Sequence, residues 1–174
     1  MHITDDEWTR YCLIPFQCSN DVRIRWFQYR ILQRLIPTNS YLSTIKMIDS
    51  DQCDFCKSSI ESIEHLFFYC PFSQKLWVDF NELLSKAGLS VNVLDVCVVI
   101  FGGFLDRMLN LIIILIKLYI FDEKKSKSKP SITGLKIFLR NYFQLQFLIH
   151  NENMNVHIWN KYWSLWSSLF KIDN

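Results

Sequence analysis

Three cysteines and one histidine are clustered in the stretch CDFCKSSIESIEHLFFYCP, residues 53–71. Cys53, Cys56, His65 and Cys70 have the spacing C-x2-C-x8-H-x4-C. A two-residue gap lets both thiolates of a tight turn bind one cation, and soft sulfur with one imidazole suits tetrahedral zinc. Because these four ligands leave no coordination position for substrate or water, they predict one structural Zn²⁺.

The proline that follows Cys70 explains how this last ligand can join the site. Ser62, with acidic neighbours, predicts a helix start that places His65 in the first helical turn. In an unbroken α-helix, Cys70 would be rotated by about 140° from His65. Pro71 pushes the residue before it out of the helical region, so the chain bends at Cys70. Cys70 then becomes the N-cap of the next helix, where the helix dipole favours its thiolate.

Composition favours a helical protein. The chain has 174 residues, is half apolar and contains only four glycines and four prolines, which disfavours a turn-rich β sandwich or barrel. We therefore expect a mainly α fold, with a small helical domain built around a CCHC zinc knuckle and a C-terminal helical bundle. A short β-hairpin around residues 46–57 is compatible with this fold class.

Helix caps, breaks and apolar periodicity divide the chain into segments. Residues 21–36 predict a helix that stops at Pro37. Its expected apolar face consists of Ile24, Phe27, Ile31 and Leu35. Further helices are expected over residues 39–48, 71–86, 109–121, 132–149 and 155–170. Residues 91–105 remain ambiguous between a short strand and the start of a buried helix.

The termini and the apolar tracts predict an intracellular protein, cytoplasmic or nuclear and not secreted. The first ten residues, MHITDDEWTR, are polar and acidic and do not resemble a secretory signal. The apolar tract at 109–121 contains Asn110 and Lys117 and falls well short of the roughly 20 residues that a membrane span needs. We expect it to form a buried helix, without a membrane partner.

Charge is unevenly distributed along the chain. Five of the seven arginines lie in the first 34 residues, although the net charge is only +2. Arg23, Arg30 and Arg34 share one stripe of the predicted helix, which is either a solvated edge or a ridge that contacts phosphates. The candidate nucleic-acid contacts are Arg23, Arg25, Arg30, Arg34, Lys124, Lys125, Lys127 and Lys129, with Trp26 and Tyr29 as candidates for base stacking.

Catalytic motifs are not evident. The sequence lacks a glycine-rich phosphate loop, HExxH and GxSxG, and no nucleophile and base stand out as a pair. The sequence therefore predicts no catalytic residue and a chain that is not an enzyme.

The order of these features resembles a known family. RIRWFQYRILQRLIPTNSYL, CDFC and ESIEHLFFYCPFSQKLW are similar to the zinc-binding domain that follows the reverse transcriptase of non-LTR (LINE-type) retrotransposons. The resemblance covers about residues 8–80. Matching positions include Glu61, His65, Leu66, Phe67, Cys70, Pro71 and Trp77. It implies a reverse-transcriptase-type zinc-binding domain over residues 8–88, and a C-terminal helical region over 89–174 that packs on it.

The resemblance also implies a function. It suggests a non-catalytic, zinc-stabilised accessory domain that contacts template RNA or target DNA, in a polyprotein whose polymerase lies outside this chain. Two alternatives stay open at this point. The domain is a docking scaffold for the polymerase portion, or a truncated relic, in either case with no nucleic-acid binding of its own.

Overall fold

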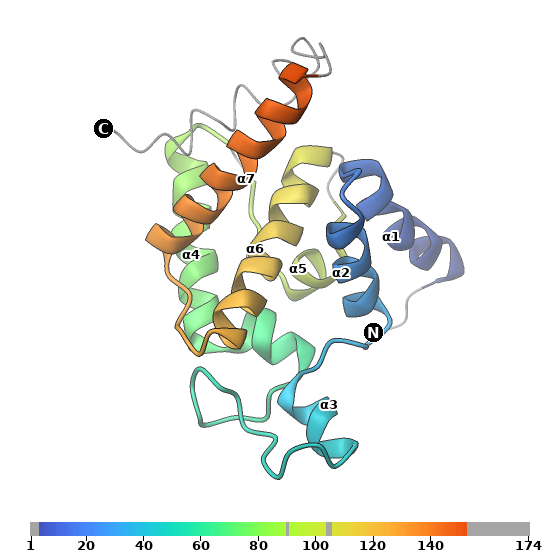
Figure 1. Cartoon of the computed structure of the whole chain (residues 1–174), viewed down its shortest axis with the longest axis vertical. Helices are drawn as coiled ribbons and strands as arrows, with labels where there is room; N and C mark the ends of the chain where they lie inside the picture. Colours follow the sequence, from blue (N-terminus) through green and yellow to red (C-terminus); the bar gives the residue numbers. More distant parts are fainter. Residues whose placement is uncertain (1–3, 90, 104–105, 153–174) are drawn as a thin grey trace.

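The computed structural model describes residues 4–89, 91–103 and 106–152 (Figure 1). Its elements are α1 (Asp5–Cys18), α2 (Val22–Leu32), α3 (Asn39–Thr44), the π-helical turn η1 (His65–Tyr69), α4 (Pro71–Lys86), α5 (Val96–Phe101), α6 (Arg107–Lys125) and α7 (Ile132–Glu152). Within these ranges no strand forms, so the mainly α class is confirmed. The helix expected over 155–170 lies outside the described residues.

The short β-hairpin that the sequence allows around residues 46–57 does not form. A single antiparallel bridge joins Gln52 to Ile60, and beside it the Cys53 amide donates to the Ser59 carbonyl at 2.8 Å. The backbone then turns tightly, because the Lys57 amide donates to the Cys53 carbonyl at 2.9 Å and Lys57 has a φ of 54°. This turn brings the thiols of Cys53 and Cys56 together, and it uses backbone N–H and C=O groups that a longer β-ladder would need for pairing between strands.

Helix α2 ends earlier than predicted. After Leu32 the chain forms a Schellman motif, in which Arg34 has a φ of 61° and the Leu35 amide donates to the Arg30 carbonyl at 2.7 Å. This turn leaves Leu35 49% exposed and buries Ile36 completely. The prediction that Leu35 belongs to the apolar face is therefore wrong. The other three predicted members of that face are buried: Ile24, Phe27 and Ile31.

Helix α6 lies at the centre of the molecule, between α2 and α7, and it also contacts α1 and η1 (Figure 1). Its residues from Met108 to Lys117 are all buried, which confirms the buried helix predicted at 109–121. A helix that is apolar on all sides belongs to a protein core or a membrane. In the described part of the chain, no helix is long and apolar enough to cross a membrane.

One core of buried side chains spans both halves of the chain. The ring of Phe27 in α2 lies 6.1 Å from that of Phe67 in η1 and 5.8 Å from that of Phe121 in α6, measured between centroids. The ambiguous segment 91–105 contains α5, a short helix capped by the Asp95 side chain. The region after residue 88 thus packs directly on the region that holds the cysteine cluster.

Candidate metal centre

The four predicted ligands come together in the structure. One ligand atom from each of Cys53, Cys56, His65 and Cys70 lies within 4.8 Å of the other three. Cys53 Sγ is 3.8 Å from Cys70 Sγ, and Cys56 Sγ is 3.4 Å from His65 Nε2. With Zn–S bonds of about 2.3 Å and a Zn–N bond of about 2.0 Å, a tetrahedron has edges of about 3.8 Å (S to S) and about 3.5 Å (S to N). The group is therefore positioned to hold one zinc ion.

A π-helical turn brings His65 and Cys70 to the same side. The His65 amide donates to Ser62 Oγ at 3.0 Å, as expected for a helix start. The Cys70 amide donates to the His65 carbonyl at 2.7 Å, an i to i+5 bond that widens the turn and places Cys70 above His65. Cys70 itself is extended, with φ −60° and ψ 131°, and it is the N-cap of α4 ahead of Pro71. The sequence predicted this bend but not the π turn.

Hydrogen bonds and burial set the acidity of the thiols. The hydrogen bond from Cys53 lowers the pKa of Cys70, and backbone amides at the start of α4 act in the same direction against burial. The same hydrogen bond, together with burial, raises the pKa of Cys53. For Cys56, burial raises the pKa, but hydrogen bonds from Ser58 and from the His65 ring outweigh it and lower the pKa overall. Cys53 would have to release its proton to hold zinc, since thiolates are the ligands of this metal.

A buried carboxylate supports the metal-binding loop, which we define as residues 51–61. Glu61 has no exposed surface. Its Oε1 accepts a hydrogen bond from the Asn39 amide at 2.9 Å, and its Oε2 accepts one from the Asp54 amide at 3.0 Å. Its counter-ion is Lys124 at the end of α6, whose Nζ lies 2.7 Å from Oε1 and donates to Asn39 Oδ1 at 3.0 Å. The C-terminal part of α6 thus supplies the positive charge that balances the buried carboxylate of the metal-binding loop.

This position corrects the role predicted for Lys124. Its side chain is only 8% exposed and already engaged, so it does not face a phosphate. Helix α6 continues through Lys125, four residues beyond the end predicted for the helix at residues 109–121. Sequence reasoning missed the pair with Glu61, because nothing in the local pattern links residues 61 and 124.

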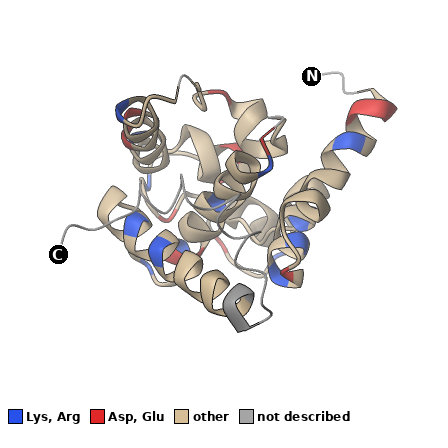
Figure 2. Ribbon diagram, turned by 90° about the horizontal axis from the view of Figure 1, so that it is seen from above, with Lys and Arg blue, Asp and Glu red and all other residues tan. Residues whose placement is uncertain are grey.

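The predicted arginine contacts differ in how available they are. Arg23 has the most open side chain, 80% exposed, and pairs with Asp21 at 2.9 Å. Arg34 is also largely exposed and pairs with Glu64, whereas Arg30 is half-buried. Figure 2 shows acidic residues concentrated at the start of α1, near the N-terminus, and α1 itself contributes one basic residue, Arg10.

The predicted lysine contacts lie near the turn between α6 and α7. Lys125 pairs with Asp122 at 2.6 Å, Lys127 is exposed, and the Lys129 ammonium lies 4.2 Å from the centroid of the Phe72 ring. The pKa of Arg23 is raised, mainly by its hydrogen bond to Asp21 and in small part by the charge of Asp122.

The fold and the site define a helical protein organised around a Cys3His metal centre. Residues 3–77 match the family described as zinc-binding in reverse transcriptase, and the matched segment contains all four ligands. This segment is therefore a reverse transcriptase zinc-binding domain, a class defined by metal binding and not by catalysis. No curated protein matches the chain.

Proposed function

We propose that this chain is a non-catalytic, zinc-stabilised accessory domain of a reverse transcriptase of the non-LTR (LINE) type, and that it contacts RNA or DNA. The observation that supports this proposal most strongly is the charge of the segment next to the metal centre. Residues 8–34 carry five arginines and a single acid, Asp21. A strongly basic face on a small domain is typical of proteins that contact phosphates.

The zinc ion has a structural role in this proposal. Its ligands fix the metal-binding loop, η1 and the start of α4 relative to one another. Phe67 of η1 packs against Phe27 on the buried side of α2, so the metal also determines where α2 lies. Trp26 lies on the solvent-facing side of α2 and Arg23 at the edge of its buried face, and both are well exposed. Zinc therefore acts on the basic face through packing.

The exposed ion pairs of this face do not prevent phosphate binding. Arg23 with Asp21 and Arg34 with Glu64 are surface pairs, and such pairs contribute only about 0–1 kcal/mol each. A nucleic-acid phosphate can replace the carboxylate at little cost. Binding of the arginines to phosphates also releases counterions condensed on the nucleic acid, so the affinity for RNA or DNA depends on the salt concentration.

A salt series tests the proposal. The zinc-loaded chain is titrated against structured RNA and single-stranded DNA in filter-binding assays at several salt concentrations. We expect the logarithm of the affinity to fall linearly with the logarithm of the salt concentration, by about 0.7 for each phosphate contacted on a single strand. The double variant Arg23→Ala/Arg34→Ala should reduce that slope by about 1.4, because two contacts are lost.

The matched control is Lys75→Ala/Lys86→Ala, which removes two equally exposed charges from α4. It should leave the slope close to that of the parent. A slope near zero for the parent, or equal slopes for the two double variants, would contradict phosphate contact by the arginines.

Docking on the polymerase portion is the second candidate function. It is supported by large apolar side chains exposed around the metal-binding loop, notably Met47 at 70% and Ile60 at 58%. Under this candidate the chain binds the polymerase portion but binds neither RNA nor DNA at near-physiological salt. Co-purification of the two portions, repeated with Met47→Ser/Ile60→Ser, separates it from the first candidate.

A further inference from the structure

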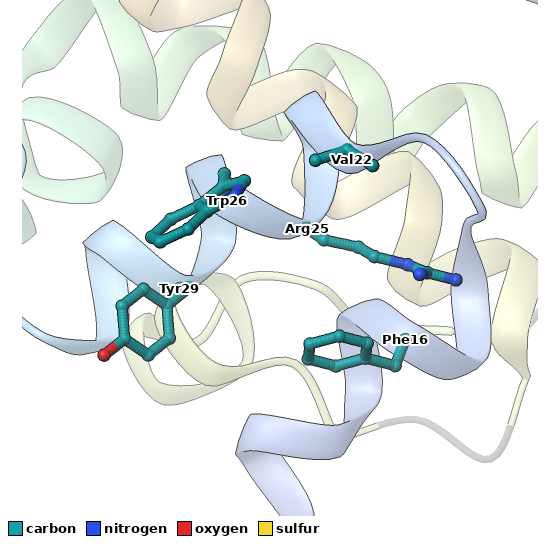
Figure 3. Close-up of a pocket in the computed structure, with 5 residues that line it drawn as sticks. All are labelled: Phe16, Val22, Arg25, Trp26 and Tyr29. Carbon is teal, nitrogen blue, oxygen red and sulfur yellow. The ribbon is translucent and has the colours of Figure 1, made fainter.

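A pocket of about 380 Å³ opens between α1 and α2 (Figure 3). Phe16 of α1 forms one wall. The other lining residues belong to α2: Val22, Arg25, Trp26 and Tyr29. The aromatic side chains are exposed: Phe16 and Trp26 each by 56%, and Tyr29 by 41%. Large aromatic groups are seldom left open to water together, so this cluster indicates a binding surface.

The walls of the pocket are held in place before any ligand arrives. Arg25 Nε donates to the Ser19 carbonyl at 2.6 Å, and its Nη2 donates to Asn20 Oδ1 at 2.9 Å. The same guanidinium lies 5.1 Å from the centroid of the Phe16 ring, a cation–π contact. Because Arg25 is already bound in this way, it acts as a flat wall of the pocket. Prepositioned walls lower the entropic cost of binding.

Trp26 and Tyr29 form the other side of the pocket. Their rings meet edge to face, with centroids 5.5 Å apart and an interplanar angle of 89°. Figure 3 shows both side chains projecting from α2 on the opposite side of the pocket from Phe16. The pocket therefore offers aromatic faces and a guanidinium plane, which suit a flat aromatic ligand.

The charge around the pocket indicates which class of molecule contains a suitable aromatic group. The described residues that line the pocket include no acid, and the nearest acid along the chain, Asp21, is paired with Arg23. A free phosphate does not suit the mainly apolar walls, and an aliphatic peptide would make no use of the aromatic rings and the guanidinium plane of Arg25. A nucleotide provides both a flat base and a phosphate, and the volume is within the range of about 300–1,000 Å³ for small-ligand pockets.

We propose that this pocket binds an unpaired base of single-stranded RNA or DNA, while Arg23 meets an adjacent phosphate. This inference rests on the proposed nucleic-acid contact and deepens it by naming the form of strand that is recognised. A base within a duplex is stacked and paired, and extracting it costs a few kcal/mol. The pocket should therefore favour single strands over duplexes of the same sequence.

Three probes separate base recognition from phosphate contact: a single-stranded oligonucleotide, an abasic strand of the same length, and the matched duplex. Binding of each to the zinc-loaded full chain is measured by fluorescence anisotropy at one salt concentration. We expect the base-bearing strand to bind about tenfold more tightly than the abasic strand, which corresponds to one stacked base. Trp26→Ala and Phe16→Ala should each reduce this ratio to near one, whereas Trp26→Phe should keep most of it.

Tyr41→Ala is the matched control, because Tyr41 is an exposed aromatic residue on α3, away from α1 and α2 in Figure 1. It should leave the ratio unchanged, and zinc content confirms that every variant is folded. Equal binding of base-bearing and abasic strands by the parent overturns the pocket and leaves the phosphate contact standing. Equal loss for both strands in Trp26→Ala also overturns it. Binding of none of the three probes refutes the proposed function itself, and the pocket with it.

Discussion

Replacing Lys124 with methionine removes the counter-ion of a carboxylate that has no access to water. The Lys124 ammonium lies 2.7 Å from Glu61 Oε1, and the two side chains are 8% and 0% exposed. After the substitution, Glu61 keeps the hydrogen bonds from the Asn39 and Asp54 amides but loses the ion that balances its charge. Met preserves most of the side-chain volume, so the change is mainly electrostatic.

The expected magnitude follows from this burial. Breaking a buried ion pair by removing one partner costs about 3–5 kcal/mol, because the remaining charge is uncompensated. Since Glu61 retains two backbone donors, we expect a loss near the lower end, about 3 kcal/mol. Lys125 is the matched control, because it is the next residue on α6 but 59% exposed. Lys125→Met should change the free energy of unfolding by no more than about 0.5 kcal/mol.

Equilibrium unfolding in urea, followed by circular dichroism in saturating zinc, measures both values. A double-mutant cycle with Glu61→Gln then isolates the coupling between the two side chains. The double variant should lose clearly less than the sum of the single losses, since no unpaired charge remains. If Lys124→Met unfolds within about 0.5 kcal/mol of Lys125→Met, the ion pair does not support the metal-binding loop and the reasoning is refuted.

Two further predictions concern the metal and a buried lysine. Cys56→Ser should lose zinc and unfold residues 53–77, because metal binding supplies folding free energy; metal analysis and thermal melting measure this, with Cys12→Ser as the control. Retention of stoichiometric zinc with a parental melting curve would rule the site out. Burial lowers the pKa of Lys117 well below 10.5, so the unfolded state binds a proton that the folded state does not. The parent should therefore lose up to about 1.4 kcal/mol per pH unit as the pH falls from 10.5 toward the folded-state pKa, whereas Lys117→Met should not. A difference in stability between the two proteins that stays constant as the pH falls from 10.5 to 9 would contradict this.

The metal ligands could be predicted because they are local in sequence. All four lie between residues 53 and 70, and the ligand types and spacing define zinc geometry without reference to the rest of the chain. The bend at Cys70 follows from the proline after it, a constraint that acts between neighbouring residues. The π turn itself was not predicted. Its one indication in the sequence is the spacing of five residues between His65 and Cys70, because an α-helix would not place two ligands at this spacing on the same side.

Errors arose where the backbone changed direction without a strong signal. Arg34 takes a positive φ, a conformation usually adopted by glycine, so no glycine marks the position where α2 ends at Leu32. As a consequence Leu35, which was predicted to be on the apolar face, is exposed, and Ile36 is buried. The hairpin that the sequence allowed at 46–57 does not form, because the tight turn at the first two ligands limits strand pairing to one bridge.

The sequence alone determined the helical class, the metal and its ligands, because periodicity, caps and ligand spacing act over a few residues. Which charged side chains are exposed and can contact a phosphate depends on the tertiary structure. It buried Lys124 against Glu61 and left Arg23 exposed, and it gathered Phe16, Trp26 and Tyr29 from two helices around one pocket. Burial and pairing depend on how distant segments pack, and a one-dimensional pattern does not encode the distance between residues 61 and 124.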